Sequence, residues 1–256
     1  MIDSRAIVDP GARLAPDVEV GPFAIVGPGV RVGAGTRIGP HAVLQGPTHI
    51  GERNHIHAFA SVGCDPQDKK YAGERAELVI GDDNVIREYC TISRGTADGG
   101  GVTRVGDRNW IMAYVHIAHD CEVGSDTIFA NSASLAGHVA IEDHVILGGF
   151  TLVHQFCRIG AHAFTGMGSV ISMDVPPFVT VSGNPAAPHG INAEGLRRRD
   201  FSPAQIARIR EAYRALYRSG LRLAEARTRI EALAREEPAL APLATFFDRA
   251  GRGILR

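Results

Sequence analysis

An aliphatic side chain recurs at every sixth position along most of this chain. Stepping by six gives an unbroken apolar series over residues 8–62, and the step resumes over 80–92 and 105–171 with Thr165 as its one polar member. The residue that follows the aliphatic one is usually glycine, as at Gly21 and Gly106. Neither an α-helix nor an isolated strand has this period. A fixed hexapeptide repeat predicts a parallel β-helix.

Each hexad supplies one short strand and one corner, with its aliphatic residue pointing into the core. Three hexads bring the chain back to its starting side, so positions three hexads apart are expected to lie one above the other. The 25 hexads predict about eight three-sided coils and a prism on the order of 40 Å long. No single coil can bury its aliphatic residue alone, so stacking makes the core continuous. We assign this repeat domain to residues 1–189.

Two segments interrupt the repeat. The polar segment 63–77 lies between Val62 and Ile80, which are three full hexads apart, so we expect a loop that leaves the prism and returns in phase. The segment 96–101 lies between Ile92 and Val105, a step one position longer than two hexads, so the phase slips there by one. Long loops on a rigid scaffold are common places for function. Both excursion loops are therefore candidate functional segments.

The last part of the chain, residues 190–256, predicts a small helical domain. Ser202, Pro203 and Gln205 have the spacing of an N-cap, an N1 proline and a capping-box partner. An apolar stripe follows and ends at Gly220. Further helices are predicted for 223–236 and 239–250, with Pro238 between them.

Charge is divided unevenly between the two parts. Residues 190–256 hold 14 arginines and 8 acidic residues, whereas residues 1–189 have an excess of seven acidic residues. A basic helical domain suggests an anionic partner, although solvated helices would show the same charge. The sequence lacks the patterns of nucleic-acid-binding modules, and it has no stretch that would span a membrane. The four cysteines lack CxxC spacing and, with no signal peptide, indicate a cytoplasmic protein with reduced thiols.

Six of the eleven histidines lie between residues 116 and 162. The three-hexad coil places His119 next to Gly137 and Asp120 next to His138, on one edge of neighbouring coils. His154 falls on the same edge one coil further. His116 and His154 flank inward aliphatic residues, so strand alternation points both of them outward.

This edge suits general-base chemistry. A neutral imidazole takes a proton from a hydroxyl near pH 7, and a backbone N–H at Gly137 would stabilise a developing oxyanion. Two other interpretations stay open: the histidines are solvated, or imidazoles on neighbouring coils bind zinc. No accompanying cysteine or carboxylate pattern supports the zinc interpretation, so we predict no metal.

Specific motifs accompany the hexads over the whole length. The chain resembles the UDP-N-acetylglucosamine O-acyltransferases that open lipid A biosynthesis. The matching stretches are PQDKKYAGE (66–74), RGTADGGGVT (94–103), HIAHDC (116–121), LAGHV (135–139), VHQFCRIGAH (153–162), DVPPFV (174–179) and NAEGLRRR (192–199).

The resemblance implies a left-handed parallel β-helix, a homotrimer, and active sites between neighbouring subunits. It implies transfer of an (R)-3-hydroxyacyl group from acyl carrier protein to the 3-hydroxyl of UDP-N-acetylglucosamine, with no cofactor besides the carrier's phosphopantetheine arm. His119 would be the general base, Asp120 would orient it, and Gly137 would supply the oxyanion contact. The acidic carrier protein would meet the basic helical domain.

The resemblance also implies a set of substrate-binding residues. The histidines and the glutamine would line the sugar and pyrophosphate site, and the two residues of the first loop would contact the hexosamine from a neighbouring subunit. The residues beyond 190 would recognise the nucleoside and its phosphates, or the phosphate of the carrier's arm. The full set is Asp68, Lys70, His116, His138, His154, Gln155, Asn192, Glu194, Arg198 and Arg199.

One position departs from the long-chain members of the family. By the resemblance, Met167 would lie at the end of the acyl groove, where those members have a small residue, so we predict a short acyl chain near ten carbons. The alternative is that Met167 packs at the trimer interface. Whether the acceptor is a 3-hydroxyl or a 3-amino sugar, and which subunit supplies each contact, stays open.

Three other classes of protein share the repeat. The N-acyltransferase of the same pathway carries a domain ahead of its hexads, but here the repeat begins at Val8. A γ-type carbonic anhydrase would carry three histidines on zinc. A non-catalytic solenoid usually repeats Thr or Ser on one outer face, which this sequence does not.

Overall fold

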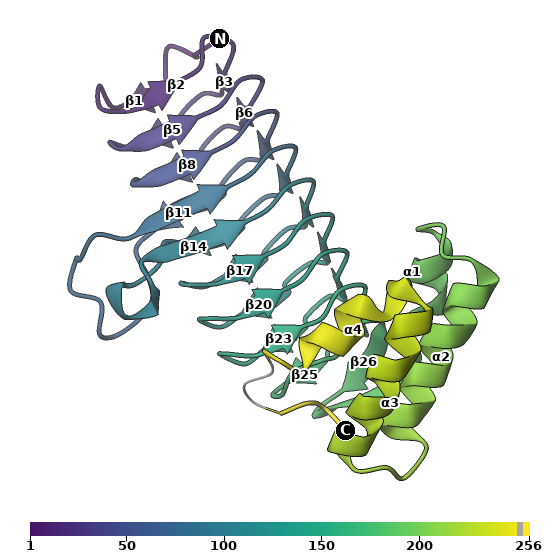
Figure 1. The fold of residues 1–256 in the computed structure, drawn as a ribbon. Coiled ribbons are helices and arrows are strands. Elements are labelled where there is room, and N and C mark those ends of the chain that lie inside the picture. The colour runs from purple at the N-terminus through teal and green to yellow at the C-terminus, as the bar shows by residue number, and fades with distance from the viewer. Residues whose placement is uncertain (250–252) are drawn as a thin grey trace.

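The computed structural model describes residues 1–249 and 253–256. The chain winds into a three-sided prism of short strands, with a group of helices at its carboxyl end (Figure 1). Each side of the prism is a parallel sheet except for the last strand of the third side, and successive strands up to β25 belong to successive sides. The coils therefore form as the hexapeptide repeat predicts.

We number the faces in the order in which the chain enters them. The first face contains β1 (Ile7–Val8), β4 (Ile25–Val26), β7 (Val43–Leu44), β10 (Ser61–Cys64), β13 (Thr91–Ser93), β16 (His116–Ile117), β19 (Ser134–Leu135), β22 (Leu152–Val153) and β25 (Val170–Ile171). The second face contains β2 (Arg13–Leu14), β5 (Val30–Val32), β8 (Thr48–Ile50), β11 (Glu77–Ile80), β14 (Val102–Val105), β17 (Glu122–Val123), β20 (Ala140–Ile141) and β23 (Arg158–Ile159). The third face contains β3 (Glu19–Val20), β6 (Arg37–Ile38), β9 (His55–Ile56), β12 (Val85–Ile86), β15 (Trp110–Ile111), β18 (Ile128–Phe129), β21 (Ile146–Leu147), β24 (Phe164–Thr165), β26 (Val179–Gly183) and β27 (Ala186–Ile191).

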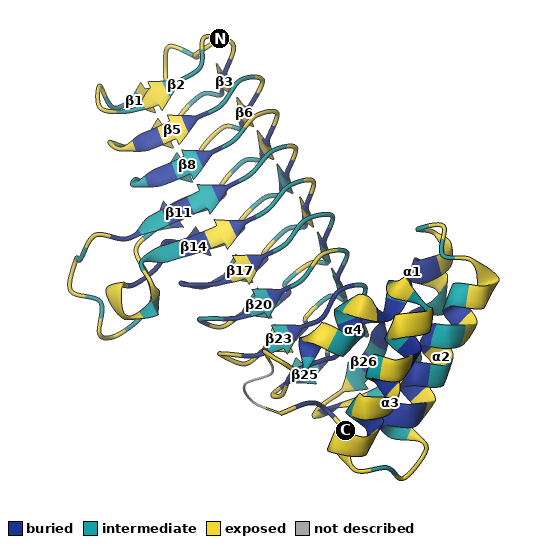
Figure 2. Ribbon diagram, in the orientation of Figure 1, coloured by how far each residue is buried: buried dark blue, intermediate teal, exposed yellow. Residues whose placement is uncertain are grey.

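The repeated aliphatic residues form the core of the prism. Val8 pairs with Val26, and Ile117 pairs with Leu135, so each partner lies three hexads further along the chain. These side chains point inward and most are fully buried, whereas the preceding residue of each strand faces outward (Figure 2). Burying one such side chain contributes roughly 1.5–3 kcal/mol, so the stacked column stabilises every coil through its neighbours.

The first excursion loop replaces a single corner, not a whole coil. Val62 on the first face pairs with Ile92, while Ile80 on the second face pairs with Ile50 and Val105. The expectation that the loop returns with its aliphatic residue inward is confirmed. The expectation that a three-hexad step returns the chain to the same face fails here, because the loop takes up two of the hexads. The second loop likewise occupies one corner and holds the short 3-10 helix η1 (Ala97–Gly99).

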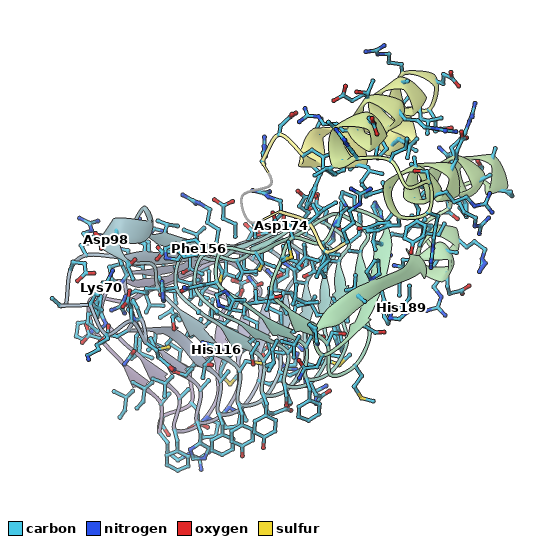
Figure 3. All side chains as sticks on the ribbon, turned by 90° about the horizontal axis from the view of Figure 1, so that it is seen from below. Lys70, Asp98, His116, Phe156, Asp174 and His189 are labelled. Atoms are coloured by element: carbon cyan, nitrogen blue, oxygen red, sulfur yellow. The ribbon has the colours of Figure 1, made fainter. Side chains whose placement is uncertain are left out.

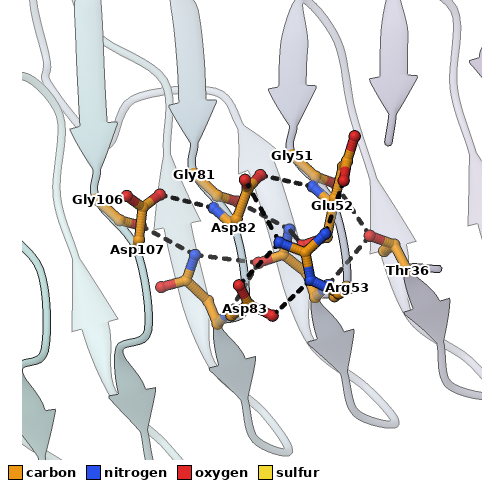
Figure 4. A network of polar contacts seen from close by, with 11 residues as sticks. Thr36, Gly51, Glu52, Arg53, Gly81, Asp82, Asp83, Gly106 and Asp107 are labelled. Atoms are coloured by element: carbon orange, nitrogen blue, oxygen red, sulfur yellow. Dashed lines mark hydrogen bonds and ion pairs between the residues drawn. The ribbon is translucent and has the colours of Figure 1, made fainter. Parts of the chain in front are cut away.

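A ladder of buried asparagines reinforces the corner between the second and third faces, at which Figure 4 labels Gly81, Asp83 and Gly106. The amide nitrogens of Asn54, Asn84 and Asn109 donate to backbone carbonyls of the next coil. Their carbonyl oxygens accept backbone N–H groups from that coil as well. On the outer side of the same corner, Arg53 forms a double hydrogen bond with Asp83 at 2.8 and 3.0 Å. The buried ladder satisfies backbone groups that the corner would otherwise leave unpaired.

The carboxyl-terminal region begins with an antiparallel hairpin of β26 and β27. The helices are α1 (Ala193–Arg197), α2 (Pro203–Tyr217), α3 (Leu223–Glu236), η2 (Pro238–Leu240) and α4 (Ala241–Phe246). The predicted capping box at Ser202 and Gln205 is confirmed, as are the bounds 223–236. The predicted helix 239–250 is wrong in extent, since it splits into η2 and α4 and its last residue, Ala250, lies outside the described residues. The predicted domain boundary at 190 falls within β27.

No helix among the described residues is long and apolar enough to cross a membrane. The four cysteines are free thiols.

Candidate active site

His119 and Asp120 form a hydrogen-bonded pair at the corner that follows β16. The Nδ1 of His119 lies 2.8 Å from Oδ2 of Asp120. Because an ionised carboxylate can only accept, Nδ1 carries the proton and Nε2 of the neutral ring is left as a base. The Asp120 backbone has φ of 59°, a left-handed conformation that Asp tolerates better than most residues. This turn directs the carboxylate back onto the imidazole.

Hydrogen bonds from the second loop and its neighbouring strand hold the Asp120 carboxylate and backbone. The backbone N–H and the hydroxyl of Thr96 donate to its two carboxylate oxygens at 2.8 and 2.6 Å. Its own N–H donates to the hydroxyl of Thr103 at 2.8 Å. The Asp120 side chain is only 1% exposed. A buried carboxylate with this many donors has one fixed orientation, so His119 is also fixed.

Gly137 lies against the His119 ring from the next coil. A Cβ at Gly137 would come within 2.5 Å of Cε1 and 2.7 Å of Nε2 of His119. The adjacent His138 N–H donates to the carbonyl of His119, as the stacking of successive coils requires. Within the described residues, the Gly137 N–H makes no hydrogen bond to the protein. This backbone donor therefore belongs to the residue that lies against the imidazole.

His138 completes the cluster from the same coil as Gly137. Its ring meets that of His119 edge-on at 5.1 Å and stacks on Phe156 at 4.5 Å. Among the described residues, the ligand atoms of His119, Asp120 and His138 are close enough to hold a metal ion, lying within 4.8 Å of one another. Asp120 already accepts from two donors besides His119, so a metal there would compete with existing hydrogen bonds.

His116, His119 and Gly137 line an open cavity of about 420 Å³ on the first face. Nδ1 of His116 lies 2.7 Å from the hydroxyl of Thr91. Burial, and to a lesser degree the nearby His119, lower the pKa of His116. His116 is thus held neutral at the wall of the cavity, and Figure 3 labels it on the prism. The other lining residues are Gln67, Ala118, Ser134, Leu135, Ala136, Leu152 and Val153.

His154 and Gln155 lie at the same corner one coil beyond Gly137 and are exposed. Nδ1 of His154 lies 3.2 Å from the carbonyl oxygen of Gln155. The coil arithmetic thus places them where the sequence predicts, next to the cavity residue Val153 but outside its lining.

The first loop reaches the cavity through Gln67. Asp68 accepts the backbone N–H of Lys70 at 2.9 Å, which forms a tight turn, and the side chain of Lys70 is exposed. Figure 3 shows Lys70 and Asp98 projecting from the same side of the prism on the two excursion loops. Among the residues that the structure describes, no hydrogen bond or ion pair joins Asp68 or Lys70 to the His119 cluster.

The predicted nucleoside and phosphate residues line a different cavity. It has a volume of about 620 Å³ and lies between the third face and α1. Asn192, Glu194, Arg198 and Arg199 all border it. Because the His119 cavity lies on the first face, one chain alone does not bring the two sets together.

The members of this second set already have protein partners. Asn192 caps α1 by accepting the Gly195 N–H and donates to the carbonyl of His162. Glu194 forms an ion pair with Arg198 at 3.1 Å. Burial lowers the pKa of Arg199, opposed by the charge of Asp126. Arg199 thus approaches the cavity as a partly desolvated cation.

Met167 lies at the corner between β24 and β25 and is 80% exposed. This corner borders the first face on the side opposite His119, three strands further along that face. Three strands correspond to about 14 Å along the prism. The exposed Leu152 lies between them on the same face.

The sequence interpretation missed the residues that support the site from behind. Thr91, Thr96 and Thr103 hydrogen-bond to His116 or Asp120, and Arg94 contacts the first loop. Arg94, Thr96 and Thr103 lie in the stretch RGTADGGGVT (94–103), which the sequence marked as a matching motif but to which it assigned no role.

Comparisons with known proteins agree with this geometry. A family model for bacterial transferase hexapeptide repeats matches residues 29–64 and 103–137. A model described as UDP-N-acetylglucosamine O-acyltransferase, domain 2, matches residues 174–255. Curated proteins named acyl-[acyl-carrier-protein]–UDP-N-acetylglucosamine O-acyltransferase are 62% identical in Alkalilimnicola ehrlichii and 58% identical in Thiobacillus denitrificans. Each alignment covers 100% of this chain and 99% of the relative.

Solved structures show the same fold. The UDP-N-acetylglucosamine acyltransferase of Francisella novicida superimposes with a TM-score of 0.98 at 44% identity, covering 100% of this chain and 94% of that one. The Acinetobacter baumannii structure gives 0.97 at 46% identity, with 100% and 99% covered. The left-handed parallel β-helix is thereby confirmed, and these relatives give no support to a carbonic anhydrase. With full-length relatives at this identity, the chain belongs to the UDP-N-acetylglucosamine O-acyltransferase family.

Proposed function

We propose that this chain transfers an (R)-3-hydroxyacyl group from acyl carrier protein to the 3-hydroxyl of UDP-N-acetylglucosamine, the first step of lipid A biosynthesis. The observation that carries the proposal is the His119–Asp120 pair, whose imidazole lies against Gly137 in an open cavity. The names of full-length relatives supply the substrates.

The first step is removal of a proton from the sugar hydroxyl. Nε2 of His119 takes the proton while Asp120 accepts from Nδ1 at 2.8 Å. The imidazolium that forms is stabilised by the buried carboxylate, which Thr96 holds in place. A positioned base of this kind contributes about 10²–10⁴-fold in rate.

The second step forms the carbon–oxygen bond and breaks the carbon–sulfur bond of the thioester. The sugar oxygen attacks the acyl carbon, and the negative charge that develops on the carbonyl oxygen is stabilised by the Gly137 N–H. The intermediate then collapses, and the proton held by His119 passes to the departing phosphopantetheine thiolate. Every atom transferred comes from the two substrates, so we propose that no further cofactor takes part.

The complete site is proposed to lie between subunits of a homotrimer. One chain places the base on its first face and the residues Asn192 to Arg199 beside its third face. Asp68 is half-buried and Lys70 is exposed, and both belong to the first loop. Apolar residues exposed on the first face support its contact with another copy, namely Ile7, Ile25 and Leu152.

We propose an acyl chain of about ten carbons, limited by Met167. Its exposed side chain stands at the far edge of the first face, where it would close a groove that begins at His119. Packing of Met167 at the subunit interface is the competing role, and a chain-length panel separates the two.

The carrier protein is proposed to dock on the basic helical domain, which carries 14 arginines over residues 190–256. We propose that the reaction takes place in the cytoplasm, where the four free cysteines would stay reduced.

The deciding experiment is an acyl-transfer assay with purified protein and hydroxyacyl carriers of ten, twelve and fourteen carbons. Both UDP-N-acetylglucosamine and its 3-amino analogue serve as acceptors. We expect transfer to the hydroxyl sugar, a preference for ten carbons, and a loss of at least about 10²-fold in kcat for His119→Ala.

His189→Ala is the matched control, since His189 is exposed on β27, away from the cavity. Near-normal turnover by a folded His119→Ala variant would refute the mechanism. A clear preference for fourteen carbons would refute the role of Met167, and transfer only to the amino sugar would refute the acceptor.

A further inference from the structure

Three consecutive residues, Arg94, Gly95 and Thr96, lead from β13 into the second excursion loop and end at its first residue. They follow β13 on the first face, and all three are buried. Arg94 is 7% exposed and Thr96 is 4% exposed. A buried arginine needs partners for its charge and its five donors, so its contacts show what this segment holds.

Arg94 forms hydrogen bonds to the first loop at its start and in its middle. Nη1 donates to the carbonyls of Gly46 and Gly63 at 2.9 and 2.6 Å. Nη2 donates to the carboxylate of Asp65 and to the hydroxyl of Tyr71. One guanidinium thus connects a turn of the preceding coil with both ends of the segment 65–71.

Thr96 likewise forms hydrogen bonds to Asp120 of the general-base pair. Its backbone N–H and its hydroxyl donate to different oxygens of Asp120. The same hydroxyl accepts the N–H of Gly99 at 3.2 Å, which caps the 3-10 helix of the second loop. Thr96 therefore joins the second loop to the carboxylate that orients His119.

Gly95 allows the hydrogen bonds of Arg94 and those of Thr96 to form next to each other. A Cβ there would lie 2.3 Å from the backbone nitrogen of Val102 and 2.7 Å from Oδ1 of Asp120. Only glycine lets the chain pass so close to both. The spacing between Arg94 and Thr96 is thereby fixed.

We propose that Arg94–Gly95–Thr96 is a positioning segment. From the buried side, it holds both the His119–Asp120 pair and the first loop in place. Thr96 holds Asp120 in the orientation that keeps the proton on Nδ1 of His119, and Arg94 holds the loop that carries Gln67, Asp68 and Lys70. The inference rests on the proposed function, because it assigns the loop to substrate binding and His119 to proton transfer.

The two ends of the segment are expected to act on different kinetic constants. Loss of the Thr96 hydroxyl weakens a charge-assisted hydrogen bond to the group that stabilises the imidazolium, which forms only during reaction. That change lowers kcat and leaves KM nearly unchanged. Loss of the Arg94 hydrogen bonds frees the first loop before substrate binds. That change raises KM for the sugar nucleotide.

The Thr96 arm compares Thr96→Val, Thr96→Ser and Thr127→Val. Valine is expected to lower kcat about 10- to 100-fold, and serine to restore most of it because it keeps the hydroxyl. Thr127 is the matched control, since it is a buried threonine whose hydroxyl donates to Asn109 at a remote corner. Nitrogen NMR of His119 is expected to show less Nδ1-protonated tautomer in Thr96→Val than in the wild type.

The Arg94 arm uses Asp65→Asn and Arg94→Lys. The Asp65 side chain is 67% exposed, so Asp65→Asn weakens its ion pair with Arg94 without disturbing the core. Both variants are expected to raise KM for UDP-N-acetylglucosamine about tenfold, with kcat within about threefold. The loop contains Lys69, Lys70 and Arg75, so trypsin should cut it faster in folded variants than in the wild type. This readout does not depend on activity.

Wild-type transfer in the same assay separates the two proposals. Wild-type protein that fails to transfer acyl groups would overturn the proposed function. An active wild type with an unchanged kcat and unchanged His119 tautomer in Thr96→Val would overturn the positioning role of Thr96. Unchanged KM and unchanged trypsin cutting in both loop variants would overturn that of Arg94.

Discussion

Single residues of this site are defined by how closely two coils approach. His119 rests on the backbone of Gly137, and a Cβ at that position would lie 2.5 to 2.7 Å from carbon and nitrogen atoms of the imidazole, well inside van der Waals contact. No backbone angle requires glycine there. Glycine is needed because any other residue would displace the base.

We therefore expect Gly137→Ala to lower kcat about 10²-fold while the coil stays folded, because a shift of about 1 Å in a catalytic group costs about that much. Steady-state kinetics and a structure of the variant would measure it. A variant with normal kcat and an unmoved His119 ring would contradict the contact.

At the scale of elements, the corners depend on buried polar side chains as much as on the aliphatic column. Asn84 is fully buried and uses its amide group in hydrogen bonds to Asn54, Gly106 and Asn109. It connects three successive coils at the corner between the second and third faces. The third-face strands beside it are very short, so their own ladders contain few hydrogen bonds.

Asn84→Ala is expected to lower the free energy of unfolding by about 2–4 kcal/mol, because it removes one hydrogen-bond partner each from the Gly106 carbonyl, the Asn109 N–H and the Asn54 side chain. Chemical denaturation would measure the change. Arg53→Ala, at the exposed ion pair of the same corner, should cause a much smaller loss. Equal losses in the two variants would show that the buried ladder has no special role.

At the scale of the whole molecule, His162 lies where the prism meets the helices. Its ring stacks on His144 at 4.7 Å and on Phe178 at 5.6 Å, and it meets Phe201 edge-on. Burial, then the nearby His144 and Arg199, lower the pKa of His162 to about 4. Its Nδ1 is buried without a hydrogen-bond partner.

Acid is therefore expected to weaken this junction. The unfolded chain binds a proton at His162 near pH 6.5, whereas the folded chain excludes it until about pH 4. Stability from this group is present above pH 6.5 and is lost as pH falls towards 4. The loss is about 2 kcal/mol after allowance for partial exposure.

His162→Phe keeps the stacking and removes the titration. Denaturation curves between neutral pH and mildly acidic pH should show a smaller loss of stability in this variant than in the wild type. The same dependence on pH in both proteins would exclude His162 as its source.

The sequence by itself determined the features that repeat. One aliphatic residue per hexad has a single physical solution, a column of stacked coils, so the strands, the core and the neighbours of His119 follow from counting. The capping residues Ser202 and Gln205 set the start of α2 in the same way, because a cap is a local interaction.

Only the tertiary structure decided the path and the contacts of the two segments that interrupt the repeat. The loops 63–77 and 96–101 obey no period, so only the folded chain shows that each replaces one corner and that Arg94 and Thr96 anchor them. The separation of His119 from Asn192 onto different faces is also a tertiary fact. These contacts join residues far apart in the chain through side-chain geometry, which no repeat encodes, whereas the hexad encodes the prism at every turn.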